Sequence, residues 1–154
     1  MILLELFTGT HNVRDLDNDE VEELLINPGM GEQGDVARAY VYEHSGRRIV
    51  IWFNDLGNHR YECSFGLRSD SPYDYPYDFN PTGTGNEFKV YSAVAQCIRE
   101  FISEFAPNAI TMVGYDERQS ALYKKASRRV MLPTGYEFDN TRANGVNIVK
   151  SVAA

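Results

Sequence analysis

Residues 86–114, NEFKVYSAVAQCIREFISEFAPNAITMVG, join the clearest helix of the sequence to a short apolar strand. Apolar side chains recur through Asn86–Phe105 at the spacing of one helix face. This stripe comprises Val90, Val94, Cys97, Ile98, Phe101, Ile102 and Phe105, with Lys89, Gln96, Arg99, Glu100 and Ser103 expected on the other faces. Pro107 ends the helix, and Ile110–Gly114 reads as a central strand. A long helix between two strands predicts that those strands are parallel.

The residues before this stretch predict an antiparallel meander. Strands are expected at Val36–Glu43, Arg48–Phe53 and Arg60–Leu67, with turn signals at Ser45-Gly46 and Asp55–Asn58. Aromatic residues then alternate through Tyr75–Phe79. Pro76 lies within that run and donates no backbone hydrogen bond, so we expect a short, bulged or edge strand there.

The remaining segments complete the predicted fold. A buried strand is expected at Met1–Phe7, a short helix at Asp15–Asn27 and a second helix at Glu117–Val130. Gly135–Phe138 and Val146–Val152 read as a terminal pair of strands. This order predicts a single α/β or α+β domain over residues 1–154, with a mixed, mostly antiparallel sheet flanked by helices.

Composition narrows the class of protein. The chain has 154 residues, 43% of them hydrophobic and 24% charged, which is typical of one globular domain rather than a disordered chain. Its net charge of -7 argues against general nucleic-acid binding, because a phosphate backbone needs a basic surface. Lys124, Lys125, Arg128 and Arg129 cluster in sequence, but a solvated helix face explains them better than a binding patch.

The cysteines and histidines indicate neither a disulfide nor a metal site. Cys63 and Cys97 lie in apolar runs, and two buried free thiols are expected. His11, His44 and His59 are scattered without ligand spacing, so no structural zinc is expected. No apolar run approaches the ~20 residues of a membrane span. We therefore expect a soluble cytoplasmic protein, or one packaged in a particle that assembles inside a cell.

A Gly-x-Gly turn precedes the main helix. In Asn80–Gly85, NPTGTG, backbone N–H groups at a helix start could cradle a phosphate. The segment matches neither a P-loop nor a dinucleotide fingerprint. Taken alone, the motif favours an ordinary strand-to-helix turn, in which glycine supplies positive φ angles.

In context, residues from about Val36 to Phe138 resemble the GNAT acetyltransferase superfamily. That family has a loop of the form Gln/Arg-x-x-Gly-x-Gly/Ala between a strand meander and a helix, and here Asn80 stands in place of the Gln or Arg. The resemblance implies acetyl-CoA as cofactor. Its pyrophosphate would be held in the loop by Asn80, Gly83, Thr84, Gly85 and, by adjacency, Asn86. It also implies a V-shaped cleft between the strand ending at Asn80 and Ile110–Gly114.

A second motif of that family has the form Ala-x-x-Leu-Tyr-x-x-x-Gly-Phe. Ser120–Ala126 matches its Leu-Tyr core, while Ser127-Arg128 replaces the Gly-Phe. The resemblance implies that Tyr123 is the general acid that protonates the thiolate of CoA, a task for which a phenol has a suitable pKa. A core tyrosine with its hydroxyl at the rim is the alternative, and the residues alone slightly favour it.

A general base is less evident. Glu62 alternates with Tyr61 and Cys63, so its side chain points away from the core. It is a candidate catalytic base, although a surface carboxylate is the commoner role. Asp74 and Asp78, among neighbouring aromatic residues, would suit either an amine-binding cleft or a protein-binding surface.

The stretch GTGNEFKVYSAVAQCIREFI, followed by Asp-Glu-Arg-x-x-x-Leu-Tyr, also resembles small GNAT-like proteins of tailed bacteriophages. That resemblance implies an acyl-CoA-dependent N-acyltransferase, or a relative with degraded catalysis, in the host cytoplasm or the virion. The alternative is a non-catalytic virion-structural or host-interaction protein. A small nucleotide-phosphate binder unrelated to GNAT is a third reading. A protein partner would contact the aromatic segment comprising Tyr73, Tyr75, Tyr77 and Phe79.

Overall fold

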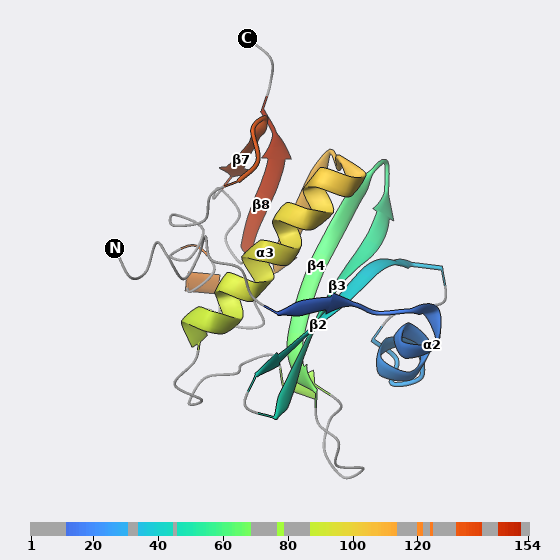
Figure 1. The fold of residues 1–154 in the computed structure, drawn as a ribbon. Helices are drawn as coiled ribbons and strands as arrows, with labels where there is room; N and C mark the ends of the chain where they lie inside the picture. The colour runs from blue at the N-terminus through green and yellow to red at the C-terminus, as the bar shows by residue number, and fades with distance from the viewer. Residues whose placement is uncertain are drawn as a thin grey trace.

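The computed structural model describes residues 12–30, 34–44, 46–68, 77–78, 87–113, 120–121, 124, 132–139 and 145–151. These residues form a mixed α+β fold with a mostly antiparallel sheet, which confirms the predicted class at that level (Figure 1). The strand order is β1-β2-β3-β4-β6-β8-β7, and β5 pairs with β4 off this path.

The predicted meander is present. β2 (Val36–His44), β3 (Arg47–Gly57) and β4 (Arg60–Arg68) pair antiparallel in sequence order. The second turn is tighter than Asp55–Asn58 suggested, because β3 continues to Gly57. Asn58 and His59 alone form the turn, with φ angles of 57° and 59°. Two consecutive left-handed residues match the twist of a two-residue hairpin, which explains how so short a turn joins two long strands.

α3 (Glu87–Phe105) and β6 (Ala109–Val113) agree with the prediction, but the parallel partner of β6 differs. We expected the strand Tyr75–Phe79. Instead, β5 (Tyr77–Asp78) is a two-residue strand that pairs antiparallel with the end of β4. β6 pairs parallel with β4 itself. The short length of β5 agrees with the short, bulged or edge strand expected from Pro76, but its antiparallel pairing with β4 was not predicted.

The remaining elements flank this centre. β1 (Val13–Asp15) pairs with β2, and β7 (Tyr136–Asp139) pairs with β8 (Gly145–Lys150), as predicted for the terminal strands. The expected helix Asp15–Asn27 begins later, because Asp17 caps it. It consists of α2 (Asn18–Val21) and the π-helical η1 (Glu22–Ile26).

Two predicted segments fall largely beyond the described residues. Met1–Phe7 lies outside them. Most of Glu117–Val130 does too, although Ser120, Ala121 and Lys124 within it are helical.

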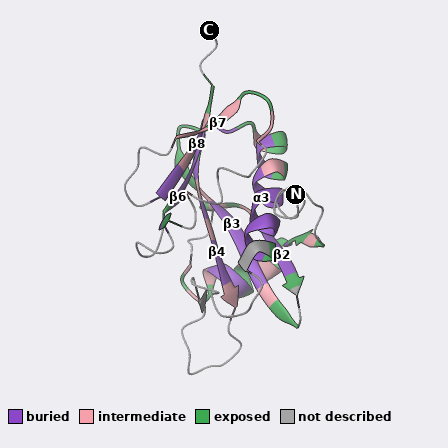
Figure 2. Ribbon diagram, turned by 90° about the vertical axis from the view of Figure 1, so that its left-hand side faces the viewer, coloured by how far each residue is buried: buried purple, intermediate pink, exposed green. Residues whose placement is uncertain are grey.

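The sheet buries apolar side chains on both faces. One face packs against α3, where the Phe53 and Phe101 rings stack with centroids 4.0 Å apart. The other face packs against η1 through Leu24 and Leu25, which contact a cluster containing Trp52. Figure 2 shows buried residues along α3 and the strands beside it. The middle strands are therefore apolar on both sides, unlike the simple alternation expected for a half-exposed meander.

α3 is more enclosed than its apolar stripe predicted. Every residue from Val90 to Ile98 is buried, including Ser92 and Gln96. Gln96 was expected on an outer face, and that expectation was wrong: its side chain is only 9% exposed and donates to Glu100 at 3.4 Å. Small residues such as Ala93 and Ala95 let this part of the helix be covered all round, which a one-sided stripe does not reveal.

Candidate functional site

The centre of the candidate site is the place where β4 and β6 stop pairing. Their parallel register covers Arg60–Glu62 against Ala109–Thr111. Both strands continue further, β4 to Arg68 and β6 to Val113, but within the described residues they pair with each other no more. Antiparallel β5 joins β4 only at Leu67 and Arg68. The parting therefore lies between β4 and β6, rather than beside the strand ending at Asn80.

A row of polar residues crosses the sheet where this pairing ends. Residues that are partners in register share one face of a sheet. The successive partners on β3, β4, β6, β8 and β7 are Asn54, Glu62, Thr111, Asn147 and Asp139. Their neighbours Tyr61, Cys63, Ile110 and Met112 pack towards α3, so the polar row lies on the opposite face. Sequence reasoning singled out Glu62 alone, because register between distant strands is not visible in sequence.

The two halves of this polar row differ in their hydrogen bonding. Thr111 is buried, and its Oγ1 donates to Asn147 Oδ1 at 3.0 Å. Asn54 Oδ1 is shielded from solvent and has no hydrogen-bond partner. Glu62 is half-buried, and the described part of the chain provides no hydrogen bond or ion pair to its carboxylate. An unpaired buried acceptor typically costs about 1–3 kcal/mol, so this end of the row lacks a donor.

The β3–β4 turn is hydrogen-bonded to its neighbours beside the segment where β4 and β6 still pair. His59 Nε2 lies 2.6 Å from the Phe105 carbonyl oxygen, and Tyr61 Oη lies 3.3 Å from His59 Nδ1. Because a carbonyl only accepts, Nε2 donates to Phe105, and in the neutral imidazole Nδ1 then accepts from the Tyr61 hydroxyl. The Asn108 backbone N–H donates to the His59 carbonyl at 2.8 Å, and its side chain donates to the Asn58 carbonyl at 3.0 Å. These bonds join the turn to the end of α3 and the start of β6.

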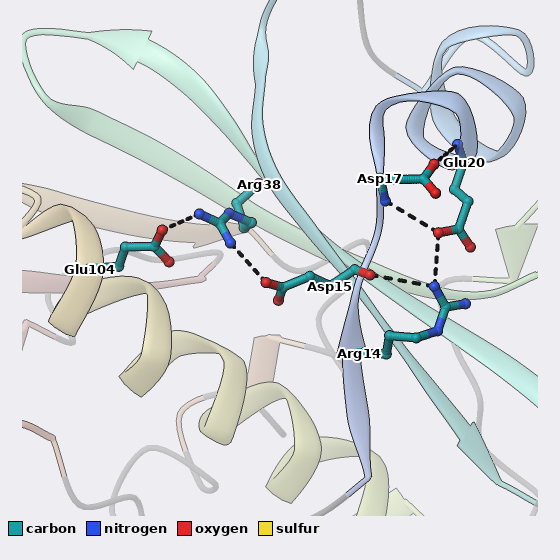
Figure 3. Close-up of polar contacts among 6 residues, drawn as sticks. All are labelled: Arg14, Asp15, Asp17, Glu20, Arg38 and Glu104. Atoms are coloured by element: carbon teal, nitrogen blue, oxygen red, sulfur yellow. Dashed lines mark hydrogen bonds and ion pairs between the residues drawn. The ribbon is translucent and has the colours of Figure 1, made fainter.

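Charged side chains hold the same end of α3 against the sheet (Figure 3). Arg38 on β2 donates to Asp15 at 2.9 Å and also pairs with Glu104 on α3. Its guanidinium carbon lies 5.4 Å from the centroid of the Phe105 ring. Arg14 bridges to Glu20 at 2.8 Å, and that hydrogen bond lowers the pKa of the Glu20 carboxyl. The Arg38 contacts therefore join α3 to β1 and β2, and the Arg14 contact joins β1 to α2.

Only one of the predicted site residues lies in the described part of the chain. Glu62 sits on β4 at the last rung shared with β6. The predicted general acid, Tyr123, lies outside the described residues. The predicted cofactor-binding residues of the loop also lie outside them, namely Asn80, Gly83, Thr84, Gly85 and Asn86. Of the proposed aromatic contact surface, only the backbone of Tyr77 is described, in β5.

The cysteines are buried and free, as predicted. Burial raises the pKa of both the Cys63 and the Cys97 thiol. Because the thiolate is the reactive form, neither sulfur is set up as a nucleophile.

Neither a candidate metal centre among the described residues nor a related protein was found. The described residues contain no group of three or more His, Cys, Asp or Glu side chains placed to hold a metal ion. Within the same residues, no helix is long and apolar enough to cross a membrane. Comparisons of the chain with family models, curated proteins and solved structures found no match.

Proposed function

We propose that the chain is a GNAT-like protein that acts as an acyl-CoA-dependent N-acyltransferase. The observation that carries the proposal is the parting of β4 and β6 just beyond Glu62 and Thr111. Where two parallel strands stop pairing, their facing edges can pair with an extended group instead. Glu62 lies at the point where the pairing ends, with its carboxylate unpaired in the described part of the chain.

The groups present suit acetyl-CoA. Its pantetheine arm is extended and carries amides, and such a chain pairs with strand edges as an added strand does. The arm would lie between β4 and β6, with the pyrophosphate on the backbone amides of Gly83, Thr84, Gly85 and Asn86, just before α3. Bound there, acetyl-CoA would supply the acyl group as a thioester.

The chain's own residues would move the protons. Glu62 would take a proton from the acceptor ammonium, directly or through water, and leave a neutral nitrogen. That nitrogen attacks the thioester carbon: the C–N bond forms, the C–S bond breaks, and the nitrogen releases its second proton, which would restore the Tyr123 phenol once that phenol has protonated the thiolate. Tyr123 would give its proton to the departing thiolate, because a phenol, with a reference pKa of about 10, is still protonated at neutral pH and can act as a positioned donor. The resemblance to phage proteins supports the cytoplasm of a bacterial host as the place of this acyl transfer.

The first test separates binding from chemistry. Acetyl-CoA at 100 times its dissociation constant should stabilise the folded chain by about 2.7 kcal/mol, which is read as a rise in melting temperature. Glu62→Gln should keep that rise and lose acetyl transfer to an amine, because the amide cannot take a proton. Glu137→Gln, at an exposed carboxylate on β7, is the matched control and should leave both unchanged.

Two results would contradict the proposal. Absence of any stabilisation by millimolar acetyl-CoA would leave a non-catalytic scaffold, of the virion or for contact with the host, as the function to pursue. Full activity in Glu62→Gln would remove Glu62 from the reaction.

A further inference from the structure

We propose that Asn54 selects the acceptor, by recognising a primary ammonium group together with Glu62. The inference rests on the acyltransferase function proposed above and extends it to the chemistry of the acceptor. Asn54 and Glu62 are direct partners across β3 and β4. Their side chains therefore lie side by side on the face of the sheet opposite α3.

Both residues offer acceptors that the described chain leaves unused. Asn54 contributes an amide oxygen without a partner, and Glu62 contributes a carboxylate. The next member of the polar row cannot supply the missing donor, because the Thr111 hydroxyl already donates to Asn147 at 3.0 Å. A ligand that satisfies this pair must bring its own donors, and beside a carboxylate a positive charge is favoured.

A primary ammonium group meets both requirements. One of its N–H bonds can point to Glu62 while another points to Asn54, whereas a tertiary ammonium has a single N–H and a quaternary ammonium has none. Glu62 thus selects for a positive charge, and Asn54 selects for a ligand that can donate a second N–H hydrogen bond. Since Asn54 Oδ1 is shielded from solvent in the ligand-free chain, engagement requires the amide to turn about its Cβ–Cγ bond. That bond belongs to the class of side-chain torsions with broad minima.

The experiment is an NMR titration of the full chain in the absence of acetyl-CoA. The probes are butylammonium and N,N,N-trimethylbutylammonium, which share an alkyl chain and a charge but differ in N–H groups. Butylammonium should shift the Asn54 side-chain amide signal in a saturable way, and the quaternary probe should not. Asn54→Leu should weaken butylammonium binding about tenfold, the equivalent of one hydrogen bond to a charged group, and bring the two probes closer together.

Two further variants test whether the effect of Asn54→Leu comes from the loss of the acceptor at this position. Asn54→Asp keeps an acceptor at this position and should retain or strengthen the preference for butylammonium. Asn18→Leu, at an exposed position in α2, should leave both titrations unchanged.

The outcomes separate this inference from the function on which it rests. Equal shifts with both probes, no shift of the Asn54 amide, or an unchanged preference in Asn54→Leu would overturn the inference. If butylammonium binds as expected but acetyl-CoA does not bind, the acyltransferase function fails while amine recognition by Asn54 stands.

Discussion

At the scale of single residues, the Tyr40 hydroxyl is a polar group of the α3 core that its surroundings do not satisfy. The Tyr40 hydroxyl is buried against α3 and has no hydrogen-bond partner. Burial raises the pKa of this phenol. Tyr136, by contrast, donates its hydroxyl hydrogen to the Pro107 carbonyl at 2.8 Å. The two tyrosines therefore make a matched pair, one with and one without a partner.

Tyr40→Phe should leave stability unchanged or increase it by about 1 kcal/mol, because it removes a buried hydroxyl that makes no bond. The edge-to-face contact with the Phe53 ring, at a centroid distance of 6.1 Å, would remain. Tyr136→Phe should lower stability by about 0.5–1.5 kcal/mol, since it removes a hydrogen bond. Urea unfolding of both variants measures the difference. A loss above about 1 kcal/mol in Tyr40→Phe would show that its hydroxyl has a partner after all.

The residues of the site show how far sequence reasoning reaches at this scale. Alternation along the strand placed Glu62 away from the α3 core, and the structure agrees. Its partners were not predicted: Asn54 and Thr111 are brought beside it only by the register of three strands. The hydrogen bonds of His59 were missed for a similar reason, because they depend on where α3 ends.

At the scale of elements, β8 approaches β6 more closely than a side chain at Gly145 would allow. A Cβ atom placed there would lie 2.0 Å from the Met112 carbonyl oxygen. Glycine is thus required at Gly145 by a close backbone approach rather than by a left-handed φ angle. This contact also sets the position of β6 beyond the point where it stops pairing with β4.

Gly145→Ala should destabilise the fold by about 1–3 kcal/mol, the usual cost of forcing extra atoms into a packed site. Lys150→Ala, at the exposed end of the same strand, should change stability by less than about 0.5 kcal/mol. Chemical denaturation of both variants makes the comparison. If Gly145→Ala is as stable as the parent chain, the β6–β8 approach described here is wrong.

Sequence periodicity predicted long elements well and short ones poorly. The meander and α3 follow from apolar spacing over many residues, and the shorter pair β7 and β8 was also predicted. β5, with two residues, is too short for any pattern to define, and it was mistaken for the parallel neighbour of β6. The π-helical turns of η1 also depend on packing: Leu24 and Leu25 reach the sheet cluster around Trp52.

At the scale of the whole molecule, the sheet has two differently used faces. One is filled by the α3 core, and the other carries the η1 cluster beside the polar row of Asn54, Glu62, Thr111, Asn147 and Asp139. The polar row crosses the sheet where β4 and β6 stop pairing. An acyl donor between the strands and an amine on the polar face would therefore meet at Glu62. Predicting this arrangement required the strand order, which composition and local pattern do not determine.

The most direct measurement is backbone hydrogen exchange with and without acetyl-CoA. If the pantetheine arm lies between β4 and β6, added acetyl-CoA should slow exchange at those amides of Cys63–Gly66 and Met112–Val113 that do not already pair with β3 or β8. Exchange at Arg60–Glu62, where the strands already pair, should change little. Unchanged exchange on both strands at saturating acetyl-CoA, or protection confined to other parts of the chain, would contradict the claim that this parting is the cofactor site.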